Sequence, residues 1–347
     1  MQRYGIYRMP AEWEKQKSTW IAWPHNKKDW PGKFIHIPLV FSKIIKIISK
    51  VQLVNILVKD KIDQKNALFF LSISGVNIKN IRLIKCKTDR AWTRDFLPIF
   101  LKDKKNKNVL SNWEFNAWSK YKNFKNDNNA YLKIKRLVKI KIIKPKFKKK
   151  KIILEGGSID VNGNGLLLTT KQCLLSKVQQ RNRGFNKYDY NNIFNEYFGI
   201  KKVIWLNKGI YGDDTHGHVD DIARFIGKNK IFIASEKNKK DKNFTNLNEN
   251  IEILKKFKKE NAEKFKVIHI PMPEPKYING IRVPASYLNF YIANKVVLVP
   301  TFKDPKDKII LKIFRKHFKN REIIPVDCSV LVWGFGTIHC LTQQEPD

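Results

Sequence analysis

The sequence predicts an α/β fold in one domain, and two observations lead to this prediction. Short runs rich in branched and aromatic residues, which favour strands, recur along all 347 residues. Lysine-bearing stretches with a helical pattern, such as residues 250–265 and 307–318, separate several of these runs. Alternating strands and helices are typical of the α/β class. Because no stretch rich in Pro, Gly or Ser divides the chain, we expect a single domain over residues 1–347.

The predicted strands are short, and polar or glycine-containing turns bound them. The glycine-rich turn at 161–165 is expected to join its neighbouring strands as a hairpin. Two lysine-rich runs, 133–151 and 236–243, are expected to be solvated loops or faces. In chain order, the predicted strands cover residues 54–58, 81–85, 97–101, 151–154, 165–170, 202–206, 230–234, 266–271, 295–300 and 321–327.

Polar clusters recur beside these strand-like runs. Asp95, Glu155, His218, Asn289 and Cys340 each lie in such a cluster, at intervals of roughly 50 to 70 residues. The sequence between the clusters shows no self-similarity. The spacing indicates repeated units around a shared centre, with the polar residues near the strand ends.

The composition is strongly basic, since 69 Lys and Arg against 31 Asp and Glu give a formal net charge of +38. Such a charge is compatible with a nucleic-acid or anionic-membrane partner. The lysines are spread along the whole chain, however, together with many Asn, Ile and Phe, as compositional drift on a solvated surface would produce. We therefore expect no specific nucleic-acid partner, and only non-specific binding if any occurs.

The cysteines and the apolar runs bear on cellular location. Cys86, Cys173, Cys328 and Cys340 show no paired spacing of the zinc-binding kind. Residues 1–16 lack the apolar run of a signal peptide, and no apolar run is long enough to span a bilayer. We expect free thiols, a cytoplasmic location and no membrane partner.

A glycine-containing segment near the C-terminus, residues 334–346, carries Cys340. Gly334 and Gly336 flank Phe335 and allow a tight loop that presents a thiol to a ligand. The alternative is a buried cysteine acting as a small apolar residue, as most free cysteines do. Cys340 is thus a candidate nucleophile. The other three cysteines resemble core or strand-edge residues, and we assign them no chemistry.

Two histidines and four aspartates lie close together within residues 211–225. In an extended stretch, residues two apart face the same side, so His218 and Asp220 are expected to reach one pocket. His216 would join them if the strand begins that early. Two alternatives stay open: ligation of zinc or iron by His and Asp, and a solvated acidic turn, which suits Asp214 better than Asp220.

Two further segments supply carboxylates. Asp95 follows Arg94 in a segment that Trp92 and an apolar run place at the edge of a core, where a carboxylate can receive a bidentate cation. An ordinary surface ion pair is the alternative. Glu155 ends a predicted strand before two glycines, and a turn cap is its default interpretation.

Together, these segments contain one thiol, one histidine and at least three carboxylates, without a convincing metal cage. No GxGxxG or GxxxxGK motif occurs, so nucleotide chemistry has no support. The small cation that several coplanar carboxylates suit best is a guanidinium.

The same segments resemble the agmatine deiminases, in the bacterial-type peptidylarginine deiminase family of the pentein superfamily. The match runs nearly end to end. Each motif alone is moderately specific for the family, and the occurrence of all seven in the same order makes the match strong. The resemblance implies a five-bladed α/β propeller of ββαβ modules around a pseudo-fivefold axis, which would explain the recurring clusters. The matching segments are residues 9–33, 88–98, 113–118, 155–170, 212–225, 285–294 and 334–346.

The resemblance also implies the reaction, which is hydrolysis of agmatine to N-carbamoylputrescine and ammonia in polyamine (putrescine) biosynthesis, with no metal or cofactor. Cys340 would form an amidino-thioether, His218 would be the general acid/base, and Glu155 would orient His218 or assist it. Oligomers are common in the family, which implies a homo-oligomer. The implied substrate-binding residues are Asp95 and Asp220, which would grip the guanidinium nitrogens, and to them we add Trp92, Asp89 and Asp214.

Three positions depart from the family pattern. Leu97 stands where a glycine is usual, and His216 stands where many relatives have an acidic residue. Phe335 interrupts a run of glycines before the nucleophile, so the loop that positions Cys340 is expected to differ or to carry strain.

Alternative functions follow from the same residues. Free arginine would need a cationic partner for its α-carboxylate near the pocket mouth, and a peptidyl arginine would need an open cleft. A degenerate scaffold that binds nucleic acid through its basic surface is the alternative from another class.

Overall fold

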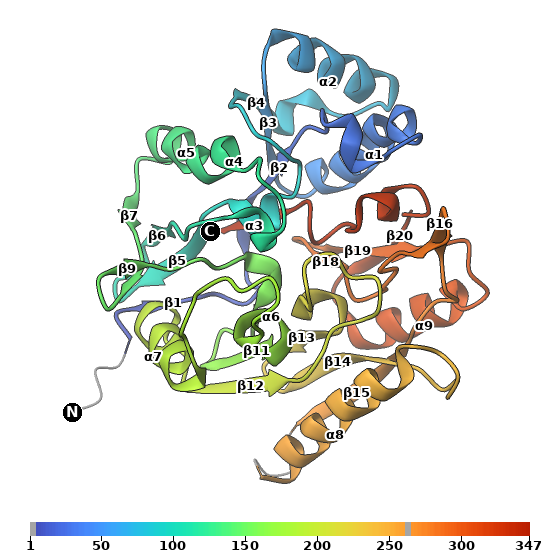
Figure 1. Cartoon of the computed structure of the whole chain (residues 1–347). Coiled ribbons are helices and arrows are strands. Elements are labelled where there is room, and N and C mark those ends of the chain that lie inside the picture. The colour runs from blue at the N-terminus through green and yellow to red at the C-terminus, as the bar shows by residue number, and fades with distance from the viewer. Residues whose placement is uncertain (1–4, 261–264) are drawn as a thin grey trace.

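The computed structural model describes residues 5–260 and 265–347 and places them in a mixed α/β fold (Figure 1). The described strands form five sheets of three or four strands and two short hairpins. In each of the five sheets one or more helices connect parallel neighbours, and an antiparallel strand flanks them. Such a connection is required because a parallel pair cannot be closed by a tight turn. Figure 1 shows the sheets following one another around the molecule in chain order, with the longer helices toward the outside.

The first sheet joins the two ends of the chain. Its strand order is β21-β2-β3-β4, in which β21 is antiparallel to β2 and the other pairs are parallel. The C-terminal segment that follows Cys340 is therefore fixed by pairing with an N-terminal strand. The elements are β2 (Gln16–Ala22), α1 (Ile37–Ser49), β3 (Leu53–Val58), α2 (Lys61–Ile73), β4 (Ile81–Lys85) and β21 (Gln343–Pro346).

The other four sheets have the orders β1-β5-β6-β7, β10-β11-β12, β13-β14-β15 and β18-β19-β20. The hairpins β8-β9 and β16-β17 lie outside the five sheets. The strands of these four sheets and two hairpins are β1 (Tyr7–Arg8), β5 (Ile99–Asp103), β6 (Asn108–Ser111), β7 (Lys141–Ile143), β8 (Lys146–Phe147), β9 (Lys150–Lys151), β10 (Asp160–Val161), β11 (Leu166–Thr170), β12 (Lys202–Leu206), β13 (Ala223–Gly227), β14 (Lys230–Ser235), β15 (Lys266–Pro271), β16 (Tyr277–Ile278), β17 (Ile281–Arg282), β18 (Tyr291–Ile292), β19 (Val296–Thr301) and β20 (Glu322–Asp327). The helices beyond the first sheet are α3 (Thr93–Phe96), α4 (Lys125–Asn129), α5 (Tyr131–Val138), α6 (Lys171–Leu175), α7 (Lys187–Phe198), α8 (Phe244–Glu260) and α9 (Asp307–His317).

Local sequence signals set the helix ends. The α7 helix begins with a capping box, in which Asn186 and Asp189 each accept the other's backbone N–H. It ends at Gly199, whose φ of 69° is a conformation that glycine adopts without steric cost. The α1 helix has a proline in its first turn and buries Phe41 and Ile45 on one face. None of the described helices combines the length and apolar composition needed to cross a bilayer.

Nine of the ten predicted strands overlap strands of the structure, and the hairpin at 161–165 is confirmed between β10 and β11. The strand predicted at 151–154 was wrong, since only Lys151 belongs to a strand and Ile153 forms a single bridge with Glu114. Ile152 and Leu154 of this run are buried in the core without joining a sheet. The run 236–243 has no helix or strand, as predicted. The prediction for 133–151 was incomplete, since this run contains most of α5, β7 and the hairpin β8-β9. The predicted helix 250–265 corresponds to α8, and residues 261–264 lie outside the described residues.

Short connecting segments, rather than the strands themselves, carry the candidate functional residues. Asp95 lies in the one-turn helix α3, and Glu155 immediately precedes the 3₁₀ turn η5 (Gly156–Ser158). His218 immediately precedes η6 (Val219–Asp221), which also contains Asp220. The prediction that His218 and Asp220 share one face of a strand was therefore wrong, although the turn still brings both side chains to one place.

Candidate active site

Cys340 lies in the loop between η7 (Leu331–Gly334) and β21, and its side chain is buried. The side chain of Asn289 donates to Cys340 Sγ at 3.1 Å, and its Oδ1 accepts the backbone N–H groups of Thr337, His339 and Cys340. One amide side chain thus fixes both the thiol and the backbone of its loop. Burial, followed by the charges of Asp220, Asp221 and Asp95, raises the pKa of the Cys340 thiol well above its ordinary value.

The loop that carries Cys340 has the unusual backbone that its sequence predicted. Phe335 has φ 63°, in the left-handed region that a bulky residue adopts at a cost. A Cβ at the following Gly336 would lie 3.0 Å from the Trp92 ring and 3.3 Å from Cys340 Sγ. The loop therefore leaves little room for a side chain at 336 and holds Phe335 in a strained conformation.

Three site side chains converge at Gly157, in η5. A Cβ added at Gly157 would lie 2.6 Å from His218 Nδ1, 2.8 Å from Asp95 Oδ1 and 3.1 Å from Asp220 Oδ2. Asp220 Oδ2 is also 3.8 Å from Cys340 Sγ. The imidazole and two carboxylates therefore meet at Gly157, where a side chain would collide with them, and the thiol lies beside Asp220.

Asp95 is buried and meets polar groups on three sides. Trp118 Nε1 donates to its Oδ2 at 2.9 Å, the Gly157 N–H donates to its Oδ1 at 3.0 Å, and His218 Nδ1 lies 3.8 Å from Oδ1. Burial raises the pKa of Asp95 to about 6, with His218 opposing the shift and the carboxylate of Asp220 adding to it.

His218 is held between carboxylates. Its backbone N–H donates to Asp213, and its Nε2 lies 3.8 Å from Glu155 Oε2. Burial alone would lower the pKa of His218, but Asp95, Cys173 and Glu155 raise it well above its ordinary value. The raised pKa favours the protonated imidazole, which is the form that a general acid requires.

Glu155 is oriented by Arg181, whose Nε donates to Glu155 Oε1 at 2.9 Å while its other nitrogens donate to the backbone carbonyls of Gln179 and Thr215. Burial alone would raise the pKa of Glu155, but Arg181 and His218 lower it to about 2. Glu155 is therefore ionised and fixed beside the imidazole, as an orienting partner must be.

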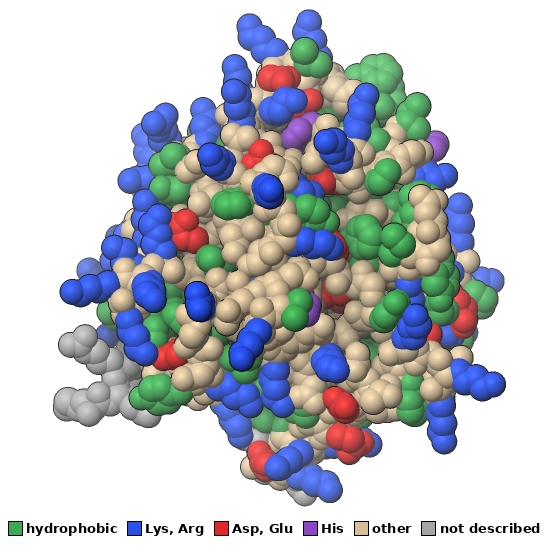
Figure 2. All heavy atoms as spheres, viewed as in Figure 1, with side chains coloured by type: hydrophobic (Ala, Val, Ile, Leu, Met, Phe, Trp, Pro, Cys, Tyr) green, Lys and Arg blue, Asp and Glu red, His purple; other side chains and the backbone are tan. Residues whose placement is uncertain are grey.

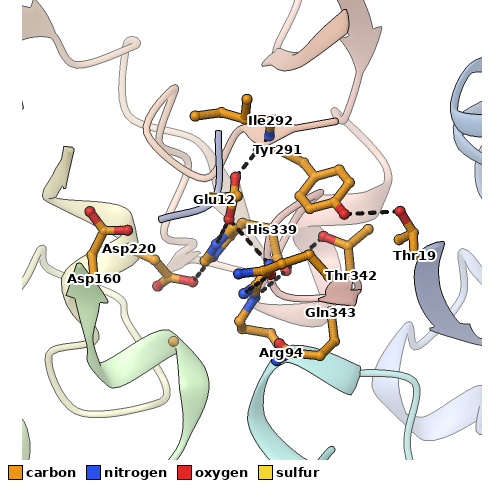
Figure 3. A network of polar contacts seen from close by, with 12 residues as sticks. Glu12, Thr19, Arg94, Asp160, Asp220, Tyr291, Ile292, His339, Thr342 and Gln343 are labelled. Carbon is orange, nitrogen blue, oxygen red and sulfur yellow. Dashed lines mark hydrogen bonds and ion pairs between the residues drawn. The ribbon is translucent and has the colours of Figure 1, made fainter. Parts of the chain in front are cut away.

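Asp220 belongs to a buried network of charges (Figure 3). His339 Nδ1 lies 2.7 Å from Asp220 Oδ2, and its Nε2 lies 2.8 Å from Glu12 Oε2. Arg94 and Arg224 lie 3.3 and 3.0 Å from the same Glu12 oxygen. Burial opposes ionisation of Asp220, but its contact with His339 lowers its pKa below the ordinary value.

A cavity of about 440 Å³ leads to this cluster. Its lining includes Cys340 and Asp95, together with the aromatic side chains of Trp92, Trp118 and Tyr121. An aromatic wall of this kind suits a short alkyl chain between polar ends.

Charged residues also line the cavity. Asp214 accepts the Tyr121 hydroxyl at 2.6 Å and pairs with Lys120. Asp29 pairs with Arg90 at 2.5 Å; burial raises the pKa of Asp29 to about 6, although Arg90 opposes this shift. The cavity thus carries two carboxylates in addition to Asp95.

Of the predicted site residues, four line the cavity: Cys340, Asp95, Trp92 and Asp214. His218, Asp220 and Glu155 are not part of its lining in the described part of the chain, but each lies within 3.8 Å of another predicted site residue. Asp89 lies apart from both groups, because its carboxylate accepts the N–H and side-chain amide of Asn126. It fastens α4 rather than facing the cavity. The ring of His216 shares a hydrogen bond with the hydroxyl of Ser176. His216 is also not among the described residues that line the cavity.

Five residues of the site were missed or given no role by the sequence analysis. Each acts through a partner distant in the chain, so sequence spacing carries no signal for it. Cys173 was assigned no chemistry, yet its sulfur lies within 4.8 Å of Glu155 and His218 donor atoms. The five are Glu12, Cys173, Arg181, Asn289 in its role as a hydrogen-bond centre, and His339.

An α/β chain that brings a thiol, an imidazole and paired carboxylates to a small cavity has the groups of a cysteine hydrolase for guanidinium compounds. Comparison with known proteins agrees with this class. The chain belongs to the Porphyromonas-type peptidyl-arginine deiminase family, which it matches over residues 8–346.

Relatives of known name are similar along the whole chain. Agmatine deiminase of Medicago truncatula is 31% identical, with 98% of this chain and 96% of the relative covered. The solved structure of a substrate-bound agmatine deiminase of C. jejuni is 32% identical, with a TM-score of 0.88 and coverage of 100% of this chain and 98% of that chain. That of the Enterococcus faecalis enzyme is 27% identical, with a TM-score of 0.88 and coverage of 99% and 96%.

Proposed function

We propose that this protein is an agmatine deiminase, which hydrolyses the guanidinium group of agmatine to N-carbamoylputrescine and ammonia. The observation that carries the proposal is the convergence of Asp95, Asp220 and His218 at Gly157, with Cys340 beside Asp220. The names of its full-length relatives support the same substrate.

In this proposal Asp95 and Asp220 hold the planar guanidinium by charge-assisted hydrogen bonds. The central carbon then faces Cys340 Sγ, which removes the orientational cost of the attack. The bound cation also offsets the carboxylates that raise the pKa of the thiol, so substrate binding itself favours the thiolate.

The reaction proceeds in two halves. The Cys340 thiolate attacks the guanidinium carbon, His218 gives its proton to the departing nitrogen, and ammonia leaves while an amidino-thioether remains. His218 then takes one proton from water, whose oxygen attacks the same carbon. The new hydroxyl loses its remaining proton to solvent as the C–S bond breaks, which releases the ureido product and restores the thiolate. Glu155, fixed by Arg181, keeps the imidazole in place for both steps.

The remaining parts of the cavity are assigned to the alkyl chain and the distal ammonium. Trp92 and Trp118 flank the alkyl chain. Asp214 receives the ammonium in place of Lys120, whose side chain is 42% exposed. Free arginine would need a cation for its α-carboxylate. Arg90 is already paired with Asp29 and Asn123, whereas Lys28 also lines the cavity, so Arg90 is not the cation that arginine would use.

The finer architecture is part of the same proposal. The five sheets are taken as five ββαβ blades around a pseudo-fivefold axis, forming a single catalytic domain over residues 1–347 that works in the cytoplasm for putrescine supply. The four free cysteines are consistent with a reducing compartment.

Product analysis with agmatine, free arginine and a blocked arginine peptide side by side tests the proposal. We expect ammonia and N-carbamoylputrescine from agmatine, with kcat/KM at least about a hundredfold above the value for the other two substrates. A preference for either arginine compound would reassign the substrate. Tight RNA binding at physiological salt without turnover of any guanidine would instead support the basic scaffold as a nucleic-acid binder. Figure 2 shows Lys and Arg scattered over the face drawn rather than gathered in one patch, which does not favour that outcome.

A further inference from the structure

Glu155 and His218 form a cluster with Cys173, a thiol that the proposed reaction does not use. Donor atoms of Glu155, Cys173 and His218 all lie within 4.8 Å of one another, and all three side chains are buried. A thiolate, an imidazole and a carboxylate are a common ligand set for zinc and similar borderline ions. We propose that Glu155, Cys173 and His218 form an inhibitory site for a zinc-class divalent ion.

Two of these donors point into the cluster without another partner. Glu155 Oε2 and His218 Nε2 lie 3.8 Å apart, and neither has a hydrogen-bond partner among the described residues. Buried polar atoms are nearly always paired, so unpaired atoms that face one another mark a place where a ligand would be stabilised. An ion centred among donors at this spacing lies within about 2.8 Å of each, and inward movements of less than about 1 Å reach zinc bond lengths.

The surroundings hold each donor in place. Arg181 occupies Glu155 Oε1 and leaves Oε2 available. Asp95 lies 3.8 Å from His218 Nδ1, so it can hold the ring with Nε2 toward the ion, as carboxylates do behind zinc-bound histidines. The hydroxyl of Thr170 accepts the Cys173 N–H and donates to the carbonyl of Gly217, the residue before His218.

Charge sets the strength of the site. On binding, Cys173 loses its thiol proton and His218 loses the proton on Nε2, so the ion displaces two protons. Cys173 and Glu155 then offset the ion with two negative charges. The positive charge of Arg181 beside Glu155 opposes binding and limits the affinity. An ion held on Nε2 keeps the imidazole of His218 from alternating between its protonated and neutral forms, so binding inhibits turnover. This inhibitory consequence rests on the proposed function, whereas ion binding itself does not.

Direct binding separates this site from the nucleophile. The full-length Cys340→Ala protein, stripped of metal, is titrated with Zn²⁺ against a chromogenic chelator and with Co²⁺ monitored by thiolate-to-cobalt absorption. We expect one equivalent of zinc and a thiolate band. Adding Cys173→Ala should remove the band and weaken zinc binding by at least about tenfold. Adding Cys328→Ala, at a buried thiol outside the cluster, should change neither.

Absence of binding, or binding of equal strength without Cys173, would overturn the site. If Cys173→Ala fails to fold, Cys173→Ser preserves the volume while offering a poor zinc ligand, and the same comparison holds.

Inhibition of agmatine turnover gives a second readout. Zinc should inhibit the natural protein, and a chelator should restore its turnover. Cys173→Ser should raise the zinc concentration needed for inhibition at least about tenfold. Equal inhibition of both would place the ion on Cys340. A protein that never turns over agmatine in metal-free buffer would refute the proposed function, while the cobalt and zinc titrations would still decide the site.

Discussion

Asp220 and Asp95 approach the same small volume beside Cys340, yet the protein holds them differently. Asp220 contacts His339 at 2.7 Å and sits in a network with Glu12 and two arginines, and its pKa lies below the ordinary value. Asp95 meets an indole N–H and a backbone N–H, and burial raises its pKa to about 6. One carboxylate is therefore ionised in the resting protein, while the other titrates near neutrality.

The difference indicates separate tasks in binding one cation. Asp220 provides a permanent charge and touches the sulfur, so it affects both substrate binding and the attack. Asp95 becomes fully charged once a cation is bound, because that cation lowers its pKa. Two equal permanent charges without a counter-ion would repel one another in a buried site, and the arrangement found here limits that repulsion.

The largest effect is expected for Asp220→Asn. Removing the permanent charge weakens the contact with His339 and loosens the guanidinium beside Cys340. Steady-state kinetics should show kcat/KM reduced by about 10³-fold, with kcat and KM both affected. A change in KM alone would show that Asp220 does not act on the sulfur.

A smaller loss, of about 10²-fold and mainly in KM, is expected for Asp95→Asn. The pH profile adds a sharper test. In the natural protein Asp95 gains a proton as the pH falls through about 6, and kcat/KM should fall with it. The variant should lack this acid limb. An unchanged limb in Asp95→Asn would assign it to another group.

Glu12→Gln tests the network behind Asp220. Burial alone would raise the pKa of Glu12, but Arg224 and His339 hold it far below its ordinary value, so its charge stabilises the fold at neutral pH and this stabilisation is lost as the pH falls. We expect the free energy of unfolding to drop by about 3 kcal/mol and kcat/KM by about tenfold.

The matched control for that variant is Glu14→Gln, two residues away, where the partner Arg8 is partly exposed. Chemical denaturation should show a loss of less than about 1 kcal/mol there. Equal losses of unfolding free energy in the two variants would contradict the prediction that the buried contacts of Glu12 stabilise the fold more than those of Glu14.

The smallest effect is expected for Trp118→Phe. This change deletes the indole N–H that donates to Asp95 Oδ2 and keeps the aromatic wall. Because the hydrogen bond favours the ionised carboxylate, its loss should move the acid limb of kcat/KM upward by about 1 pH unit or less. A shift to lower pH would contradict the role given to this donor.

Sequence reasoning predicted the α/β class and most interior strands, because branched residues recur at strand spacing there. The strand β12 agrees with its predicted range of 202–206. The strand β2 was missed, since its residues QKSTWIA mix polar and apolar types. Its polar members Ser18 and Thr19 are buried because they bond to Glu345 and Tyr291, which are distant in the sequence.

The candidate site divides in the same way. Residues that carry chemistry, such as His218 and Cys340, stand in conspicuous polar or glycine-rich segments and could be found from the sequence together with the family resemblance. Residues that position them could not, because their partners are remote. His339 is adjacent to Cys340 in the chain, but its meaning depends on Glu12 and on Asp220.

Trapping the reaction on the protein tests the central claim most directly. The natural protein is mixed with agmatine, quenched in acid during turnover, and digested for mass spectrometry. The account predicts an amidino adduct on the sulfur of Cys340, absent from Cys340→Ala. Product formation with no adduct at Cys340, or with an adduct on Cys173, would contradict it.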